Sequence, residues 1–426
     1  MKVVHFVQRY PPALGGSEAY FQRLSRYLSG NGHSVSVWTT TAIELEAFWR
    51  RSAQGVPAGV NTDQGVQVRR YNLWRWPLRR YMLKALSLYP NRTWQALTMP
   101  CNPIAMEMWR DAGQFEGPCD IVHATAFPYA WPIVCARRLA RRRNVPFVLT
   151  PFLHLGAPED GRDPTRRQYL SAPLIALLRS ADCVFVQTPT ERDVVLSLEI
   201  AETRVVLQGL GVEPSECCGG ERMRARQRFD LPGDALVIGH LANLSQEKGS
   251  LDLLDACARL WKKGAKFRLL LAGPQMKNFR RFFERYTEAN RVRVAGVLND
   301  EERRDFFAGI DIFALPSRSD SFGLVLLEAW ANGLPNVAYR AGGPADLIRH
   351  GKDGLLAGCG DIDELASHLE TLLNNTDLRR ALGDAGFGRI DKEFRWPDKL
   401  SLVEQKYAEL IASSRASQPN PAARQS

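Results

Sequence analysis

The sequence predicts an α/β protein built from two doubly wound domains that face a cleft. Strand-like and helix-like segments alternate along most of the 426 residues, which is typical of parallel sheets covered by helices. The alternation falls into two series, and the second begins near Leu236 after a stretch rich in Gly, Cys and Pro. A chain of this length also exceeds one ordinary domain. We therefore expect a ligand to bind between the two domains.

The first series opens with a β-rich run, a Pro- and Gly-rich loop at residues 10–16 and an amphipathic helix from about 17 to 30 that ends at a glycine. Residues 41–110 are less regular, and we expect loops and short helices there, over one edge of the sheet. The predicted strands of this series are residues 2–7, 35–40, 121–124, 147–150, 183–187 and 204–207.

The second series predicts helices at residues 251–262 and 300–308, between strands at 236–241, 268–272, 292–295, 312–315 and 336–339. Residues 211–233 are the expected hinge. We predict an N-terminal domain over residues 1–212 and a C-terminal domain over 213–395. A final helix at 396–412 returns to the first domain, and the Ser-, Pro- and Gln-containing tail 413–426 is expected to be disordered.

The composition is that of an ordinary globular protein, with 45% hydrophobic and 24% charged residues. No apolar run reaches the length of a membrane span, and the N-terminus, MKVVHFVQRYPP, has no h-region of a signal peptide. Eight cysteines stand without a CxxC or His/Cys cluster, so we expect reduced thiols, no zinc site and a cytoplasmic location.

The formal net charge of +10 permits nucleic acid, anionic lipid or an anionic small substrate as a partner, but no nucleic-acid-binding module is recognisable. Residues 66–106 hold seven basic residues, interleaved aromatic residues and no acidic residue. One interpretation is a surface that docks on an anionic membrane, which would make the protein peripheral on its inner face. The other is a solvated basic surface with aromatic residues in the core.

Asp320 and Glu328 frame a Ser-Phe-Gly turn that leads from a predicted buried strand into a predicted buried helix. Gly323 would let a ligand approach the backbone, and the first amides of the helix suit a diphosphate. Glu328, about one and a half turns into the helix, could accept hydrogen bonds from a ribose diol. The alternative is that Asp320 is an N-cap and Glu328 a paired core carboxylate.

Three further turns follow predicted strands. Lys248-Gly249 precedes a helix, and its ammonium could neutralise a diphosphate. Gly342-Gly343 opens another turn of this kind in the second domain. Gly15-Gly16 does the same in the first domain, facing the cleft from the other side. Each of these features alone is commonly structural, and their order and spacing together carry more information.

This ordered set, with Gly333-Leu334-Pro335 and Gly351-x-x-Gly354-Leu355-Leu356, resembles the family 4 retaining glycosyltransferases, which have the two-Rossmann-domain fold called GT-B. The similarity covers about residues 1–40 and 120–412. It implies an enzyme that moves a sugar from a nucleotide-diphosphate sugar, UDP- or GDP-linked, to a glycan or lipid-linked acceptor in cell-surface polysaccharide biosynthesis. It also implies that no metal or other cofactor takes part.

The resemblance also implies a role for each matching residue. Glu328 would bind the ribose hydroxyls, and Asp320 the hydroxyls of the transferred sugar. Lys248, with Gly15 and Gly16, would help to hold the diphosphate, and the base would lie near residues 294–298, including Val297. The backbone amides that would bind the diphosphate directly belong to Phe322, Gly323, Leu324 and Val325.

The chain departs from the family pattern at two positions. Asp320 stands where the family usually has Glu, and Asn243 where it usually has an Arg, so positive charge on the leaving diphosphate is reduced. His154, after a strand of the first domain, matches a position near the donor sugar and the acceptor. His123 is a second candidate, and for both the alternative is a structural histidine.

No carboxylate of the first domain is a clear nucleophile for double displacement. The front-face route favoured for this family fits better, with Lys248 stabilising the leaving group while Asp320 and His154 orient the sugar. Two other functions remain open. A non-catalytic relative would bind a sugar nucleotide without transfer, and a sugar-nucleotide 2-epimerase would need further acid and base carboxylates.

Overall fold

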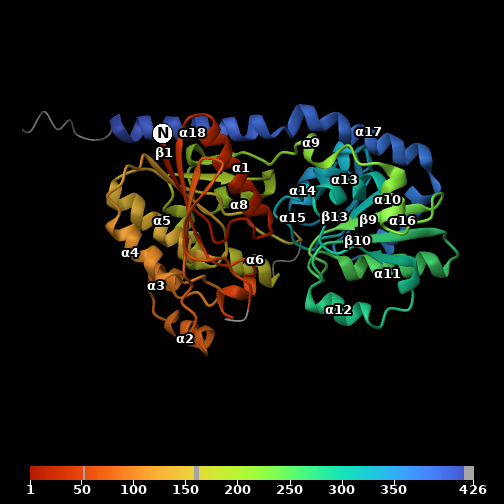
Figure 1. Ribbon diagram of the computed structural model, residues 1–426, viewed down its shortest axis with the longest axis horizontal. Helices are drawn as coiled ribbons and strands as arrows, with labels where there is room; N and C mark the ends of the chain where they lie inside the picture. The colour runs from red at the N-terminus through yellow and green to blue at the C-terminus, as the bar shows by residue number, and fades with distance from the viewer. Residues whose placement is uncertain (51–52, 158–162, 417–426) are drawn as a thin grey trace, which may run out of the picture.

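In the computed structural model, which describes residues 1–50, 53–157 and 163–416, two parallel sheets form two lobes (Figure 1). The first sheet has eight strands in the order β3-β4-β2-β1-β5-β6-β7-β8. Only β3 runs antiparallel to its neighbour. The strands are β1 Lys2–Phe6, β2 Ser34–Thr40, β3 Gly59–Asp63, β4 Val66–Tyr71, β5 Ile121–Ala124, β6 Phe147–Leu149, β7 Cys183–Val186 and β8 Val205–Leu207.

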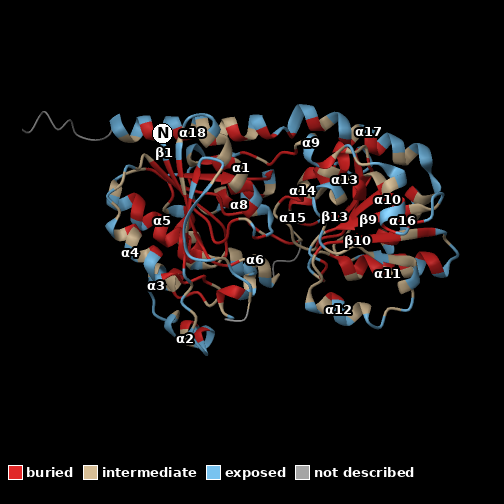
Figure 2. Ribbon diagram, in the orientation of Figure 1, coloured by how far each residue is buried: buried red, intermediate tan, exposed pale blue. Residues whose placement is uncertain are grey.

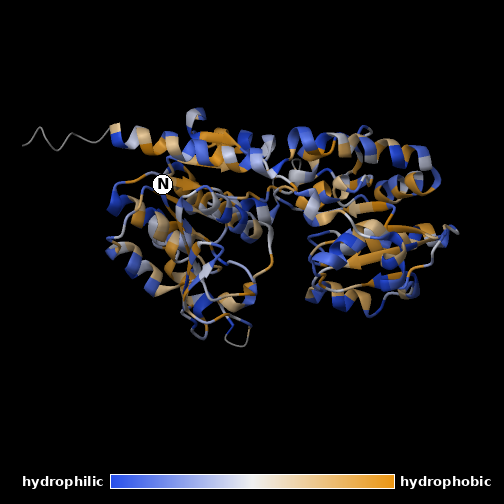
Figure 3. Cartoon of the chain, turned by 45° about the horizontal axis from the view of Figure 1, so that its top comes forward, coloured by the Kyte–Doolittle hydropathy of each residue, from blue (hydrophilic) through white to orange (hydrophobic). Residues whose placement is uncertain are grey.

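The second sheet has six strands, all parallel, in the order β11-β10-β9-β12-β13-β14. They are β9 Leu236–Leu241, β10 Phe267–Ala272, β11 Val292–Val294, β12 Ile312–Leu315, β13 Asn336–Tyr339 and β14 Gly354–Ala357. The expected two doubly wound domains are thereby confirmed. The central strands of both sheets are mostly hydrophobic (Figure 3), as expected for strands covered on both faces.

Helices connect the strands and cover the sheets. The first lobe has α1 Gly16–Gly30, α2 Arg79–Leu86, α3 Arg92–Leu97, α4 Met106–Gln114, α5 Ala130–Arg143, α6 Pro164–Tyr169, α7 Ala172–Arg179 and α8 Pro189–Ser197. The linker and second lobe have α9 Pro214–Cys217, α10 Arg222–Arg228, α11 Ser250–Lys262, α12 Lys277–Phe283, α13 Asp300–Gly309, α14 Leu324–Ala331, α15 Gly342–Leu347, α16 Ile362–Asn374, α17 Thr376–Glu393 and α18 Trp396–Ala416.

Strand β1 illustrates how the first sheet is packed. Val3 belongs to the core that α1 and α18 share, whereas Val4 and Phe6 belong to the core on the α5 face. Successive side chains of a strand point to opposite faces, so a strand buried on both sides is apolar throughout. This explains why β1 reads as a continuous hydrophobic run.

The prediction for residues 41–110 was incomplete, because it missed β3 and β4. Strand β4 pairs in parallel with β2 and extends the sheet, and β3 closes the edge as an antiparallel strand. Short helices α2 and α3 do occur in this region. The expected hinge at 211–233 likewise contains two helices, α9 and α10.

The final helix crosses back to the first lobe, as expected (Figure 1). Val212 N donates to Phe394 O at 2.8 Å, so the two chain crossings between the lobes lie side by side. The helix continues to Ala416, past the predicted end at 412, and residues 417–426 lie outside the described ranges. Within the described ranges, no helix combines the length and apolar composition that crossing a membrane requires.

Candidate active site

Three helix N-termini meet at one edge of the second sheet. Strands β9, β12 and β13 are neighbours, and each leads through a short loop into α11, α14 or α15. Because the strands are parallel, their carboxyl ends lie at the same edge. Gly249 and Gly323, which precede α11 and α14, have φ values of +71° and +90°. The amides of a first helical turn have no intrahelical acceptor, so this edge is suited to an anion.

Lys248 and Asp320 form an ion pair at this edge. Lys248 Nζ lies 2.6 Å from Asp320 Oδ2, and the other oxygen of the carboxylate accepts from Phe322 N at 3.2 Å. Burial acts to raise the pKa of Asp320, but Lys248, His154 and the Phe322 amide together outweigh it, and the pKa lies below its usual value. The backbone of the same residue is also fixed, since Asp320 O accepts from Gly343 N at 2.8 Å.

His154 approaches this pair from the first lobe. Its Nδ1 lies 3.4 Å from Ser319 Oγ, and its ring packs against Tyr169 with centroids 5.1 Å apart. Burial, with a further contribution from Lys248, lowers the pKa of His154 to about 4. The imidazole is therefore neutral near pH 7, and it can donate one hydrogen bond and accept another. The structure thus brings His154, Lys248 and Asp320 together, as the sequence predicts.

Glu328 has a partner that sequence reasoning missed. Arg303 on α13 donates through Nε to Glu328 Oε2 at 2.9 Å and through a terminal nitrogen to Oε1 at 2.5 Å. Burial raises the pKa of Glu328 even though Arg303 opposes it. Oε2 also accepts from the terminal nitrogen, whereas Oε1 accepts only from that nitrogen and keeps a second lone pair that can accept from a hydroxyl group. Nothing in the local sequence of α13 marked Arg303.

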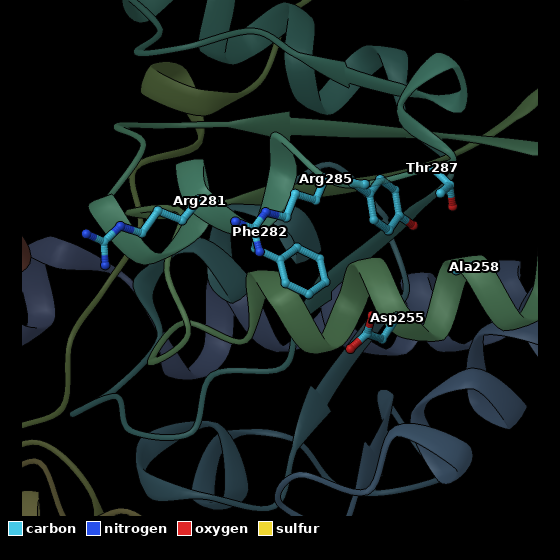
Figure 4. A pocket seen from close by; sticks show the side chains of 7 residues that line it. Asp255, Ala258, Arg281, Phe282, Arg285 and Thr287 are labelled. Atoms are coloured by element: carbon cyan, nitrogen blue, oxygen red, sulfur yellow. The ribbon is translucent and has the colours of Figure 1, made fainter.

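Val297 lines a hollow of about 340 Å³ at the ends of β10 and β11. Its other lining residues are Gly273, Pro274, Gln275, Arg280 and Gly296. This is the region where the sequence predicts the base of the donor. A second hollow of about 480 Å³ lies between α11 and α12, lined by Asp255, Arg281 and Arg285 among others (Figure 4). It includes none of the predicted site residues.

Asn243 lies in the bend after β9, where its neighbour Leu244 donates through N to Pro274 O at 2.8 Å. This places Asn243 beside the segment that lines the smaller hollow. Its side chain makes no hydrogen bond to any residue in the described ranges, and the side chain is neutral. Arg280, which lines the hollow and donates to Gln275 O at 3.0 Å, supplies a cation there.

The Gly15-Gly16 turn is built on a buried ion pair. Arg9 and Glu18 lie 2.6 Å apart, and Arg9 also donates to Leu14 O at 3.1 Å. A Cβ on Gly15 would lie 2.2 Å from Glu18 Oε2, whereas one on Gly16 would meet no atom within 4 Å. Among the described residues, no hydrogen bond or ion pair joins this turn to Lys248 or Asp320.

Two contacts cross between the lobes near the site, one from the His154 loop and one from α8. Gly342 N donates to Gly156 O at 2.9 Å, and Thr190 donates to both oxygens of Asp346, at 2.9 and 2.7 Å. A third feature, Glu191, lies within the first lobe and was not singled out from the sequence.

Glu191 fixes the same loop from beneath. Its buried carboxylate accepts from Leu153 N at 2.8 Å and from Gln187 N at 2.6 Å. Burial raises the pKa of Glu191 to about 7. A buried carboxylate without a cationic partner is costly, so the two amide hydrogen bonds are its compensation. Glu191 is therefore placed to set the position of His154, the residue that follows Leu153 in the loop.

His123, the second histidine candidate, belongs to the core of the first lobe. It is fully buried, and its ring nitrogens lie 2.5 Å from Tyr407 Oη and 2.7 Å from Thr150 Oγ1. Tyr407 is on α18, so this histidine helps to attach the returning helix. The structural interpretation of His123 is the correct one.

Within the described ranges, no three His, Cys, Asp or Glu side chains gather closely enough to hold a metal ion. Lys248, Arg303 and the helix N-termini contribute positive charge at this edge. That the reaction is independent of metal stays a prediction.

Two family models match the sequence and together cover most of it. Glycosyl transferases group 1 matches residues 221–389, and the Glycosyl transferase 4-like domain matches residues 15–211. The lipopolysaccharide core biosynthesis glycosyltransferase LpsE of Rhizobium meliloti is 30% identical over 256 residues, which are 59% of this chain and 68% of LpsE.

Solved structures share the arrangement of both lobes. The sucrose-phosphate synthase of Thermosynechococcus elongatus matches with a TM-score of 0.72 at 21% identity, over 97% of this chain and all of that one. HepE of Anabaena in complex with UDP-glucose matches with a TM-score of 0.68 at 18% identity, over 97% and 100%. These matches establish the fold, and with the family models and LpsE they show that the chain is a GT-B enzyme that belongs to the family 4 glycosyltransferases.

Proposed function

We propose that the chain transfers a sugar from a UDP-sugar to a hydroxyl group of a glycan or lipid-linked acceptor, with retention of the anomeric configuration and without a metal ion. The observation that carries the proposal is the cluster of Lys248, Asp320 and His154 at the convergence of three helix N-termini. UDP is preferred over GDP because the structural relative HepE is described as a complex with UDP-glucose.

In this mechanism the second lobe binds the nucleotide. The diphosphate lies at the N-terminus of α14, where the amides of Gly323, Leu324 and Val325 point toward it. Lys248 moves from Asp320 toward the diphosphate and stabilises the charge that develops on it. Glu328, held by Arg303, accepts from the ribose hydroxyls. The base occupies the hollow beside Val297.

The first lobe places the acceptor. Asp320 and neutral His154 bind hydroxyls of the donor sugar and hold the anomeric carbon toward the first lobe. The anomeric C–O bond to the diphosphate breaks as the acceptor oxygen bonds to the same face. The acceptor proton passes to the departing phosphate oxygen, so no protein nucleophile is required. Positioning and charge stabilisation are then the protein's whole contribution.

The acceptor would be part of a cell-surface polysaccharide pathway, since the relative LpsE is named for lipopolysaccharide core biosynthesis. A lipid-linked acceptor would bring the protein to a membrane surface, and the cationic segment 66–106 fits an anionic one.

A panel of UDP- and GDP-sugars, each incubated with the full-length protein and assayed for nucleotide release with and without chelator, tests the proposal. We expect release from a UDP-sugar that is stimulated by an acceptor and unchanged by the chelator. Tight UDP binding with no release or transfer from any donor would point to a non-catalytic sugar-nucleotide-binding protein instead.

A further inference from the structure

Helix α2 lies at the tip of the first lobe (Figure 1), and much of it is exposed (Figure 2). Exposed apolar side chains are concentrated in and around this helix. Fifteen large apolar side chains are exposed in the described ranges, and eight of them fall between residues 74 and 94. We call these eight the α2 face: Trp74, Trp76, Leu78, Tyr81, Leu86, Leu88, Tyr89 and Trp94. Contiguous exposed apolar surface on a globular protein marks a binding site.

These side chains are not core residues of a loosely built region, because other residues of the same segment supply its core. Tyr71, Leu83 and Ala96 are buried with α5. Arg79 is buried too, and it donates to Trp74 O at 3.2 Å and to Asn102 O at 2.6 Å, which fastens the loop before α2 to the lobe. These buried residues attach the segment to the lobe while the side chains of the α2 face stay exposed.

The charge on this face is of one sign. Arg80, Lys84 and Arg92 are exposed among the apolar side chains, and residues 66–106 contain no acidic residue. The carboxylates that flank this segment in the sequence are Asp63, which is paired with Arg26 at 2.6 Å, and Glu107, which is exposed in the first turn of α4. Trp and Tyr beside Lys and Arg are the side chains that settle at the headgroup level of a bilayer, where rings are half-buried and cations meet anionic lipid.

The face is also connected to the acceptor side of the site. The Arg80 guanidinium lies 5.1 Å from the ring centroid of Trp49, and Phe48 packs on Tyr129 with centroids 5.1 Å apart. Phe127 N in turn donates to Pro151 O at 2.9 Å, three residues before His154. A headgroup bound at the face would therefore lie on the same lobe, and at the same sheet edge, as the proposed acceptor position.

We propose that the α2 face inserts into the headgroup region of an anionic lipid bilayer and holds the first lobe on the membrane where a lipid-linked acceptor is found. The location of the acceptor rests on the proposed function, whereas membrane binding itself does not. An acidic protein or a nucleic acid would be attracted by the cations alone, and neither would require eight exposed apolar side chains in one segment.

Sedimentation of the full-length protein with phosphatidylcholine vesicles containing about 30% phosphatidylglycerol, and with pure phosphatidylcholine vesicles, tests this. The apolar variant is Tyr81→Ser/Leu88→Ser/Tyr89→Ser, and its matched control is Val60→Ser/Met223→Ser/Phe387→Ser, also exposed. The charge variant is Lys84→Glu/Arg92→Glu, with Lys266→Glu/Lys352→Glu as its control. UDP affinity, measured for every protein, reports that the site is folded.

We expect the wild type to bind the anionic vesicles and both controls to match it. Binding should weaken about tenfold or more in the apolar variant and in the charge variant, with UDP affinity unchanged. The proposal would be overturned if the apolar variant bound anionic vesicles as tightly as the wild type does. It would also be overturned if the wild type bound duplex DNA as tightly as the vesicles and only the charge variant lost that binding. If the wild type neither bound UDP nor transferred a sugar, the proposed function would be contradicted, but the conclusion from the vesicle experiment would be unaffected.

Discussion

The Lys248 ammonium lies 2.6 Å from Asp320 Oδ2, so the cation proposed for the diphosphate is held in the unliganded site by the carboxylate proposed for the sugar. Donor binding must exchange one partner for the other. The attraction between the two charges keeps each of them ordered before the donor arrives, and it lowers the pKa of Asp320. Because Lys248 is assigned to the diphosphate and Asp320 to the sugar, substitutions at the two positions should affect different steps.

Lys248→Ala should lower kcat by about a hundredfold to a thousandfold, because the charge that develops on the leaving diphosphate loses its cation. Steady-state kinetics with the best UDP-sugar measures this. Asp320→Asn should mainly affect recognition of the sugar, so affinity for UDP alone should stay near the wild-type value. Equal losses of UDP affinity in both variants would contradict the separate roles.

Glu328→Ala should weaken UDP binding by about tenfold to a hundredfold, since hydrogen bonds from the ribose to a carboxylate are lost. Calorimetry with UDP, and with uracil-containing ligands that lack the ribose hydroxyls, measures the effect. The variant and the wild type should bind the 2′,3′-dideoxy nucleotide equally. An unchanged UDP affinity would leave Glu328 only its structural pairing with Arg303.

Gly16→Ala should leave the free protein stable, because a Cβ at this position meets no atom within 4 Å. If the turn approaches the diphosphate, the same methyl group should weaken donor binding. Gly249→Ala is the contrasting variant, since its Cβ would lie 1.7 Å from Pro316 O and should destabilise the fold. Thermal unfolding and donor titration of both variants would show whether Gly16 is needed by the ligand.

Glu191→Gln should change the pH dependence of turnover. The carboxylate accepts two backbone amides beneath the His154 loop only when it is ionised, and burial raises its pKa to about 7. We expect kcat of the wild type to rise through pH 7 and that of the variant to be lower and flat there, with donor KM little changed. Glu191→Asp should recover part of the loss.

The contribution of Glu191 to folding stability should fall as the pH rises, whereas kcat should rise. Its pKa is raised from 4.5 to about 7 in the folded protein, so folding is favoured by the protonated form. This contribution is fully present below pH 4.5 and is lost as the pH rises through 7. Glu191→Gln should remove that dependence in urea unfolding measured across this interval. A variant with the pH profiles of the wild type would show that Glu191 does not position the loop.

His154→Gln should reduce the change in the free energy of unfolding between about pH 4 and pH 6.5. The pKa of His154 falls from 6.5 to about 4 on folding, so the unfolded chain binds the proton more readily between these values. The contribution of neutral His154 to the free energy of unfolding is therefore fully present above pH 6.5 and is lost as the pH falls to about 4. The free energy of unfolding of the variant, measured at both ends of this interval, should change less than that of the wild type.

The sequence predicted the fold well where each strand is buried on both faces. Continuous apolar runs such as Cys183–Val186 and Ile312–Leu315 signal buried parallel strands without any knowledge of tertiary structure. Strands β3 and β4, at one side of the first sheet, gave no such signal. Gly59–Asp63 is almost wholly exposed. In Val66–Tyr71 the apolar alternation is interrupted by Arg70, whose guanidinium donates to Asn61 Oδ1 and to Pro11 O.

Site residues that belong to one loop-and-helix pattern were predictable, and those that depend on tertiary contacts were not. Lys248 and Asp320 each follow a strand of the second sheet, and parallel strands bring such positions together. Arg303 and Glu191 act through partners 25 and 38 residues away, for which the local sequence holds no signal. The exposure of Trp76 and Tyr81 likewise depends on which neighbours fill the core.

The most direct test of the central claim is the anomeric configuration of the first product formed, observed by proton NMR during turnover of an α-linked UDP-sugar. The proposed mechanism predicts an α-linked product from the start, in amounts that fall about a hundredfold or more with Lys248→Ala. A β-linked first product, or an α-linked product formed equally fast by Lys248→Ala, would contradict it.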